Sequence, residues 1–164
     1  MSIPPSEMKI ELKAEVKNEG IKDWQPKVIA FLCQRGPYLG ADQAGLNRLS
    51  YNSHLSIIRI PCIGRVDLLF LLKAFEKGAD GVLIAGCHQE DCCHSSNNYQ
   101  YRKNLFLFQN LLEFCGFDPR RIHFSCISKG EGVKWSNLVN EVISQVREAG
   151  PFPTRLRQEE EDYD

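Results

Sequence analysis

Seven cysteines are distributed over this chain of 164 residues, and they are the side chains best able to do chemistry. Four of them directly follow, or nearly follow, apolar runs that read as strands: Cys33, Cys62, Cys87 and Cys126. Two more, Cys92 and Cys93, lie in the polar loop after Cys87. Because the carboxyl ends of parallel strands lie on one edge of a sheet, we expect several of these thiols to converge there.

Thiolates are soft ligands that select zinc, copper(I) or iron-sulfur clusters. Structural zinc sites typically use Cys-x-x-Cys pairs, and the chain has none. Single thiols from three separate turns, with a second thiol from the last loop, suit an iron-sulfur cluster instead. The best set of four is Cys33, Cys62, Cys87 and Cys92, with Cys93 as the alternative to Cys92.

Other polar residues near these thiols are weaker candidates. His88 and His94 are possible ligands or hydrogen-bond donors to cluster sulfur, against the simpler interpretation that they are surface histidines. Arg65, beside Cys62, is a candidate to offset the negative charge of a thiolate-bound cluster, although solvation at a helix end explains it equally well. Cys115 is expected to pack at a helix end, and Cys126 lies near the site by topology but stays outside the ligand set.

The elements that must position the thiols follow from the hydrophobic pattern. We expect strands over residues 28–32, 55–60, 81–86 and 121–125. The run 81–86 is apolar throughout, which is typical of a strand buried on both faces. Helices are predicted over 42–49 with Asp42 as N-cap, from about 67 to 77, over 99–114, and from the capping-box sequence 128–131 to Gly150.

Four strands that alternate with four helices predict the α/β class. We expect a small three-layer sandwich with a four-stranded parallel sheet, flavodoxin-like in outline. Residues 1–25 form an N-terminal extension, 26–150 the α/β domain and 151–164 a polar, acidic tail. Neither a dinucleotide fingerprint nor a Walker loop occurs at a strand-to-helix turn, so a nucleotide cofactor is not supported.

Composition excludes several classes of function. The net charge of −1 gives no broad basic surface, so nucleic acid is not an expected partner. No segment approaches the roughly 20 apolar residues of a membrane span, and we expect a soluble, cytoplasmic protein. In a reducing compartment, seven cysteines favour metal or redox roles over disulfides. The second helix is apolar on nearly every face, so part of it is expected to meet a partner.

Several segments together resemble the delta subunit of methyl-viologen-reducing hydrogenase: 28–42, 61–67, 73–82, 85–88 and Asp91-Cys92. The resemblance covers roughly residues 26–150. It implies a small protein with one two-iron, two-sulfur (2Fe-2S) cluster that carries electrons between a hydrogenase or other dehydrogenase and a heterodisulfide-reductase-like flavoprotein subunit. Such complexes belong to anaerobes and can perform electron bifurcation. The family member in them transfers electrons and is not itself the catalyst.

The chain departs from that family at Gly36, where a second cysteine three residues after the first is usual. Cys33, Cys62, Cys87 and Cys92 still match family cysteines, so a set of four candidate ligands remains. If the family needs the missing thiol, the cluster here is expected to be altered, unusually ligated or absent. Two other functions stay open. One is a cluster-free adaptor subunit that bridges larger redox subunits, and the other is a thiol redox enzyme with Cys33 or Cys87 as nucleophile.

Overall fold

A parallel sheet in the order β2-β1-β3-β4 forms the middle layer of the structure, a computed structural model that describes residues 24–153. The elements along the chain are β1 (Val28–Cys33), α1 (Pro37–Leu46), β2 (Leu55–Ile60), η1 (Ile63–Arg65), α2 (Leu68–Glu76), β3 (Gly81–Gly86), α3 (Ser95–Phe114), η2 (Pro119–Arg121), β4 (Ile122–Cys126) and α4 (Gly132–Ala149). The predicted α/β architecture, a four-stranded parallel sheet with four helices, is confirmed.

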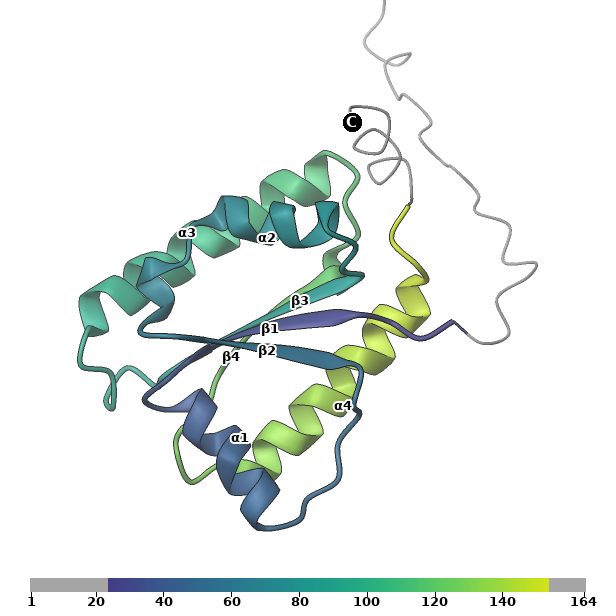
Figure 1. Ribbon diagram of the computed structural model, residues 1–164. Coiled ribbons are helices and arrows are strands. Elements are labelled where there is room, and N and C mark those ends of the chain that lie inside the picture. Colours follow the sequence, from purple (N-terminus) through teal and green to yellow (C-terminus); the bar gives the residue numbers. More distant parts are fainter. Residues whose placement is uncertain (1–23, 154–164) are drawn as a thin grey trace, which may run out of the picture.

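The helices divide between the two faces of the sheet, with α2 and α3 on one side and α1 and α4 on the other (Figure 1). The central strands supply both cores, because successive side chains point to opposite faces. Leu32 and Leu83 pack with the α4 side, whereas Cys33 and Ile84 pack with the α2 and α3 side. Cys87 also belongs to this second core, so the chemistry-bearing thiols lie toward α2 and α3.

The start predicted for the first helix, at Asp42, is wrong. Helix α1 begins at Pro37 and ends at Leu46, with Gly36 as N-cap. Proline favours the first helical position, because its fixed φ suits the helix and its missing N–H would have no intrahelical partner there. The buried residues of α1 are small, Gly40, Ala41 and Ala44 among them, so this helix carries no stripe of large apolar residues that a sequence pattern would detect.

The third helix also starts earlier than predicted, at Ser95 instead of Tyr99. Its first turn is polar, so the apolar periodicity that marks a buried helix face is missing there. The other two helices follow the prediction more closely. Asp67 caps α2 by accepting a hydrogen bond from the Leu69 N–H at 2.9 Å. Of the apolar stripe predicted for α4, Leu138 is half-buried and the other members are buried: Trp135, Val139, Val142, Ile143 and Val146.

The start of α4 shows half of the expected capping box. The Glu131 carboxylate accepts a hydrogen bond from the Ser128 N–H at 2.7 Å, but the Ser128 hydroxyl donates to Asp91 at 2.8 Å instead of capping the helix. The helix therefore begins at Gly132, with Glu131 as N-cap. Gly132 is needed there, since a Cβ on it would lie 2.9 Å from the Ala44 backbone nitrogen of α1.

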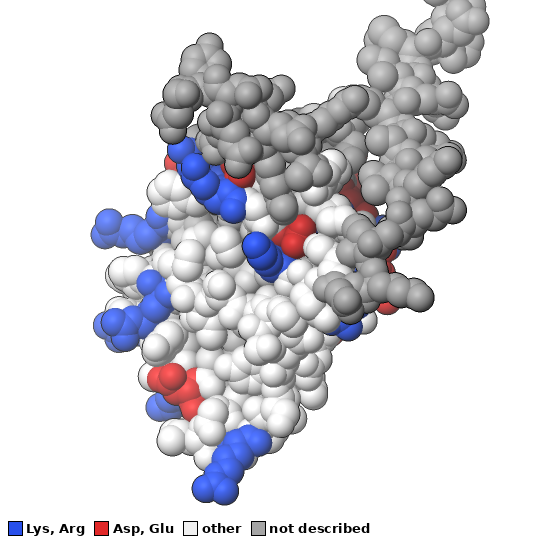
Figure 2. All heavy atoms as spheres, turned by 45° about the vertical axis from the view of Figure 1, so that its right-hand side comes forward, with Lys and Arg blue, Asp and Glu red and all other residues white. Residues whose placement is uncertain are grey.

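Lysine and arginine side chains on the face seen in Figure 2 lie mostly along its margin and are not gathered into one basic patch. Residues 1–23 of the predicted N-terminal extension and 154–164 of the predicted acidic tail lie outside the described residues. Within residues 24–153, no helix is long and apolar enough to cross a membrane.

Candidate redox site

Two thiols meet at the carboxyl edge of the sheet. Cys33 is the last residue of β1, and Cys87 follows the last residue of β3. These strands are neighbours, with Leu32 opposite Ala85, so the two cysteines leave the sheet side by side. Both are buried, and their Sγ atoms are 3.4 Å apart. The predicted convergence of thiols from separate strands is therefore present for this pair.

Hydrogen bonding between these thiols makes them unequal in acidity. The Cys87 thiol donates to the Cys33 sulfur, which lowers the pKa of Cys33 to about 6 against the opposing effect of burial. The same hydrogen bond, together with burial, raises the pKa of Cys87. The first proton therefore leaves the pair readily and the second does not, which is how two closely coupled acids behave.

Two further cysteines lie in the electrostatic neighbourhood of the pair. Cys62, at the start of η1, is buried, which raises its pKa, and its thiol interacts with the charges of Cys33 and Cys92. Cys92 is half-buried and packs against the same core as Cys33 and Cys87. The structure thus brings all four predicted ligands to one region, although the only sulfur contact among them close enough for a hydrogen bond in residues 24–153 is that of Cys33 and Cys87.

The remaining cysteines divide as follows. Cys93 is exposed, next to Cys92 in the loop. Cys126 ends β4 half-buried, and burial raises its pKa, while the charges of Arg102 and Lys134 oppose that effect. Cys115 is exposed at the C-cap of α3, at the opposite end of that helix from the cysteine loop, so the expectation that it packs is wrong.

Thiolates are suitable ligands for a metal centre, and the sulfur atoms of one pair also have a suitable separation. Two thiolates on one tetrahedral metal with metal-sulfur bonds of about 2.3 Å lie about 3.8 Å apart, close to the separation of Cys33 and Cys87. In the conformation of residues 24–153, no group of three histidine, cysteine or acidic side chains is already arranged around one metal position. A single metal ion with three or four of these ligands would therefore require other thiols to move toward the pair, whereas a two-iron cluster needs only two thiols at each iron.

Gly36 lies directly against this pair. A Cβ at Gly36 would be 2.6 Å from the Ile127 carbonyl oxygen and 3.1 Å from the Cys87 Sγ. The first distance is shorter than real contacts allow, and the atom it meets is backbone, which cannot rotate away. Any side chain at this position, including the cysteine that the family resemblance implies, would force the loop between β1 and α1 or the segment after β4 to shift.

The side chain of His88 contacts two residues at the start of α4. Its Nε2 lies 2.9 Å from a Glu131 carboxylate oxygen and 3.4 Å from the Lys134 Nζ. The hydrogen bonds from the Ser128 N–H and from His88 hold the pKa of Glu131 at about 2, so its carboxylate is charged at neutral pH. Arg65 ends η1 with an exposed side chain, and its backbone N–H donates to the Cys62 carbonyl at 3.0 Å.

Asn98 is a residue of this site that the sequence did not indicate. Its buried side chain donates from Nδ2 to the Cys87 carbonyl at 2.9 Å. This bond fixes the backbone where β3 passes into the cysteine loop. No local signal marks Asn98, because it lies in the first turn of a helix whose start was itself mispredicted, eleven residues from its partner.

A hollow of about 380 Å³ opens beside Cys87, between the loop after β1 and the loop after β4. Its lining includes Arg35, Gly36, Asp91 and Lys129. The second helix, part of which is expected to meet a partner, exposes Leu69 and Phe70. Large side chains of α3 are exposed as well: Phe106, Leu107, Leu111 and Phe114.

Comparisons with known proteins are consistent with the thiol geometry. Residues 28–150 match the family described as "Methyl-viologen-reducing hydrogenase, delta subunit". The chain is 37% identical over 130 residues to the iron-sulfur subunit of the vhc F420-non-reducing hydrogenase of Methanococcus voltae, covering 79% of this chain and 90% of that protein. It is 36% identical over 131 residues to the iron-sulfur subunit of the F420-non-reducing hydrogenase of Archaeoglobus profundus, covering 80% and 96%.

A second kind of relative is much longer. The chain is 36% identical over 134 residues to one polypeptide of the ferredoxin/F420H2-dependent CoB-CoM heterodisulfide reductase of Methanosarcina acetivorans. The match covers 82% of this chain but 17% of that polypeptide. A domain similar to this chain therefore also exists as part of a larger redox protein.

Proposed function

Because the chain belongs to the family of methyl-viologen-reducing hydrogenase delta subunits, we propose that it is an electron-transfer protein that holds a 2Fe-2S cluster at its carboxyl sheet edge. The observation that carries the proposal is the contact between Cys33 and Cys87, two buried thiols at 3.4 Å from neighbouring strands. When bound, such a cluster supplies one-electron transfer at this edge.

In this proposal, Cys33 and Cys87 hold one side of the cluster and Cys62 and Cys92 the other. The readily lost proton of the Cys33–Cys87 pair favours the thiolate form that metal binding needs. Asn98 fixes the backbone at Cys87, and the core around α2 and α3 excludes water from the buried side of the site.

His88 and Arg65 keep the roles proposed from the sequence, as a hydrogen-bond donor to the site and as a compensating positive charge. Since the Nε2 of His88 is already engaged by Glu131, its Nδ1 is the nitrogen left for a contact with sulfur. Hydrogen bonds to cluster sulfur raise the reduction potential, so these residues would adjust it rather than hold the metal.

The proposed partners are a heterodisulfide-reductase-like flavoprotein and a hydrogenase or other dehydrogenase. The iron-sulfur relatives carry hydrogenase names, and the Methanosarcina relative places a similar domain inside a heterodisulfide reductase polypeptide. The exposed apolar side chains of α2, Leu69 and Phe70, are a suitable contact surface for such partners. We propose that the complex acts in the cytoplasm of an anaerobe, where it can take part in electron bifurcation.

The first test is to measure iron and acid-labile sulfide per chain on anaerobically purified protein, with the electron paramagnetic resonance spectrum of the reduced sample. The proposal expects about two irons and two sulfides per chain and a signal on reduction. Replacing Cys33 by serine should abolish or strongly reduce both, whereas Cys115→Ser is the matched control and should leave them unchanged. No iron after anaerobic reconstitution would contradict the proposal.

That negative result would favour one of two other functions. A cluster-free chain that still binds redox proteins would be an adaptor. The short Cys33–Cys87 contact specifically favours the third function, a dithiol that forms a reversible disulfide. Counting free thiols before and after mild oxidation of the iron-free chain, with Cys87→Ser as control, separates these two outcomes.

A further inference from the structure

The outer edge of β4 has no partner strand within residues 24–153, since β4 pairs with β3 alone at the end of the sheet order. The Ile127 N–H donates to the Gly86 carbonyl of β3, which sets the direction of the backbone groups along β4. Because these groups alternate from side to side, those of Ile122, Phe124 and Cys126 point away from β3. The Ile122 carbonyl takes a hydrogen bond from Gln109, and Phe124 stays at the middle of the open edge.

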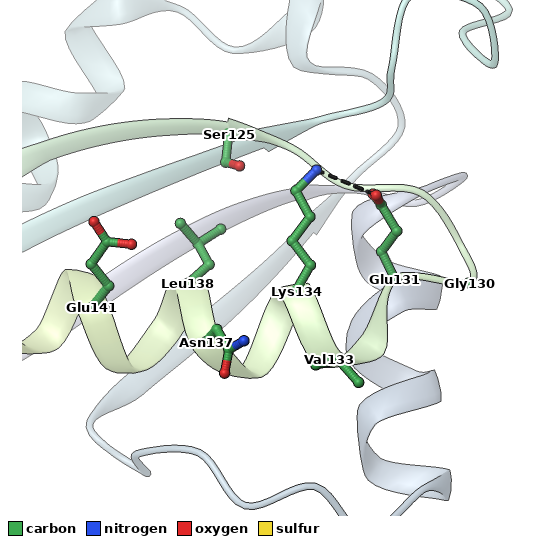
Figure 3. A pocket seen from close by; sticks show the side chains of 8 residues that line it. All are labelled: Ser125, Gly130, Glu131, Val133, Lys134, Asn137, Leu138 and Glu141. Carbon is green, nitrogen blue, oxygen red and sulfur yellow. Dashed lines mark hydrogen bonds and ion pairs between the residues drawn. The ribbon is translucent and has the colours of Figure 1, made fainter.

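A groove follows this edge on each face of the sheet. On the α4 side, a groove of about 580 Å³ is lined by Ser125 of β4 and by α4 residues that include Lys134, Leu138 and Glu141 (Figure 3). On the α3 side, a groove of about 410 Å³ is lined by residues that include Phe124, Phe106, Arg102 and Lys103. The Arg102 guanidinium lies over the Phe124 ring, 5.4 Å from its centroid. A strand laid along β4 would place alternate side chains in the two grooves, which is the arrangement of strand addition at a sheet edge.

The described residues of the chain do not fill this position. In the doubly wound order that this sheet follows, a fifth strand after the last helix would pair with β4. Here the chain after α4 turns instead toward the α2 side. The centroid of the Phe152 ring lies 5.1 Å from that of the Phe75 ring and 5.6 Å from that of the Phe117 ring. Arg121 holds that turn by donating to the Gly150 and Pro151 carbonyls.

The α4 groove is complementary to a second copy of itself. Lys134, Leu138 and Glu141 stand in a row on the side of α4 that faces β4, with Leu138 in the middle (Figure 3). Lys134 already forms an ion pair at 3.4 Å with Glu131 of its own chain, so in a two-fold pairing it would lie between two carboxylates. A two-fold axis beside Leu138 would bring each Lys134 opposite the Glu141 of the other copy, so two attractive charge pairs form and the leucines meet between them. Isologous contacts of this kind need a surface with opposite charges at its two ends.

The same two-fold axis is compatible with the positions of the residues that β4 and α3 place at this edge. Ser125 lies between the levels of Lys134 and Leu138 in Figure 3. Phe124 is the residue before Ser125 in β4, about 3.3 Å back along the strand, with its side chain on the opposite face of the sheet. Gln109 of α3 contacts Ile122 of β4. Phe124 is two residues after Ile122 in the strand, and the α3 residues beside it lie about one helical turn before Gln109, next to Phe106. Phe106 has 62% of its surface exposed, and the axis would bury it against its copy.

We propose that two copies of this chain pair antiparallel through their β4 edges, about an axis at Phe124, to form one continuous eight-stranded sheet. The Phe124 residues exchange both backbone hydrogen bonds across the axis. Leu138 and Phe106 cover the junction on its two faces, and the Lys134–Glu141 pairs fix the register. This association is separate from the cluster, because it requires none of the proposed ligands.

The other sheet edge is less suited to pairing. Strand β2 carries Arg59, and a charge on an edge strand opposes the addition of another strand. Most of the β2 side chains are exposed, and the hollow of about 370 Å³ at this strand reaches only its first two residues, Leu55 and Ser56. The β2 edge therefore provides a matched control for the β4 edge.

The test measures the mass of the full, anaerobically purified chain by sedimentation velocity over a dilution series. The wild type should reach twice the 18.7 kDa of one chain. Lys134→Glu and Glu141→Lys each convert two attractive pairs into two repulsive ones, so each should weaken the dimer about tenfold or more. The double variant restores opposite charges and should restore the dimer. Circular dichroism checks that every variant is folded.

Ile57→Lys on the β2 edge should leave the dimer intact. A wild type that stays monomeric at all concentrations overturns the proposal. A dimer that survives both single charge reversals, or that the double variant does not restore, overturns the β4 register. A dimer that Ile57→Lys dissociates shows pairing through β2 and overturns the proposal as well. Iron content, measured on the same samples, reports separately on the proposed cluster.

Discussion

Close packing around the thiols is the dominant feature at the scale of single residues. Cys33, Cys87 and the Ile127 carbonyl all lie around Gly36, and the space for a Cβ there is already taken. The φ of Gly36 is −124°, a value open to other residues, so the requirement for glycine comes from this close approach and not from backbone strain. The glycine at position 36 and the short contact of the two thiols thus belong to one arrangement.

Replacing Gly36 by alanine should destabilise the protein by about 1–3 kcal/mol, because the added Cβ overpacks against backbone and sulfur. The matched control is Gly130→Ala, since a Cβ at Gly130 meets nothing within 4 Å. The midpoint of chemical denaturation, measured anaerobically, checks both variants. Equal stability of the two variants would show that the loop relaxes freely and that Gly36 is not needed for packing.

At the scale of secondary structure, α1 is held by small residues. A Cβ at Gly40 would lie 2.8 Å from the Ile127 side chain and 2.9 Å from the Ser128 carbonyl oxygen, so the helix packs directly on the segment after β4. Ala44 of the same helix meets Gly132 of α4. These contacts join the loops on either side of Cys87, and α1 therefore helps to position the candidate site.

Two glycines of α1 should respond in opposite directions to the same substitution. Gly40→Ala should lower stability by about 1–3 kcal/mol through its clash with backbone. Gly45→Ala, in the same helix with nothing within 4 Å of its Cβ, should raise stability by about 0.5–1 kcal/mol, because alanine favours the helix. Denaturation midpoints of the two variants test this, and a gain in stability for Gly40→Ala would contradict the packing described here.

On the scale of the whole molecule, Arg121 ties together distant parts of the chain. Its buried guanidinium donates to the carbonyls of Asp80, before β3, and of Ala149, Gly150 and Pro151, after or at the end of α4. Burial lowers its pKa, but the charge is retained in a ring of carbonyl oxygens. The amino end of the sheet and the last helix are therefore fixed to each other by one side chain.

Arg121→Met should destabilise the protein by about 3 kcal/mol or more, because the carbonyls would lose their donor while they stay largely buried. For a chain of this size, that loss corresponds to a fall of about 6–12 °C in Tm. Arg120→Met is the control: its ion pair with Asp118 is exposed, and such pairs contribute about 0–1 kcal/mol. Thermal unfolding followed by circular dichroism measures both, and a similar Tm for the two variants would refute the role given to Arg121.

Local patterns in the sequence determined most of the elements of this protein. Continuous apolar runs predicted the four strands to within a residue, and the apolar stripe of α4 predicted the last helix. Burial of one or both faces of an element places its apolar residues at a regular spacing in the sequence. The placement of cysteines at strand ends was also enough to predict that thiols from separate strands would converge, as Cys33 and Cys87 do, since parallel strands end on the same edge.

Only the tertiary structure decided what fills the space between these elements. The need for glycine at position 36, the bond from Asn98 to Cys87 and the pairing of His88 with Glu131 all join residues that are far apart in the sequence. The early start of α1 at Pro37 and the open edge of β4 depend likewise on packing between elements. Such contacts depend on how separate segments are placed in space. The pattern of residues along one segment does not determine that placement.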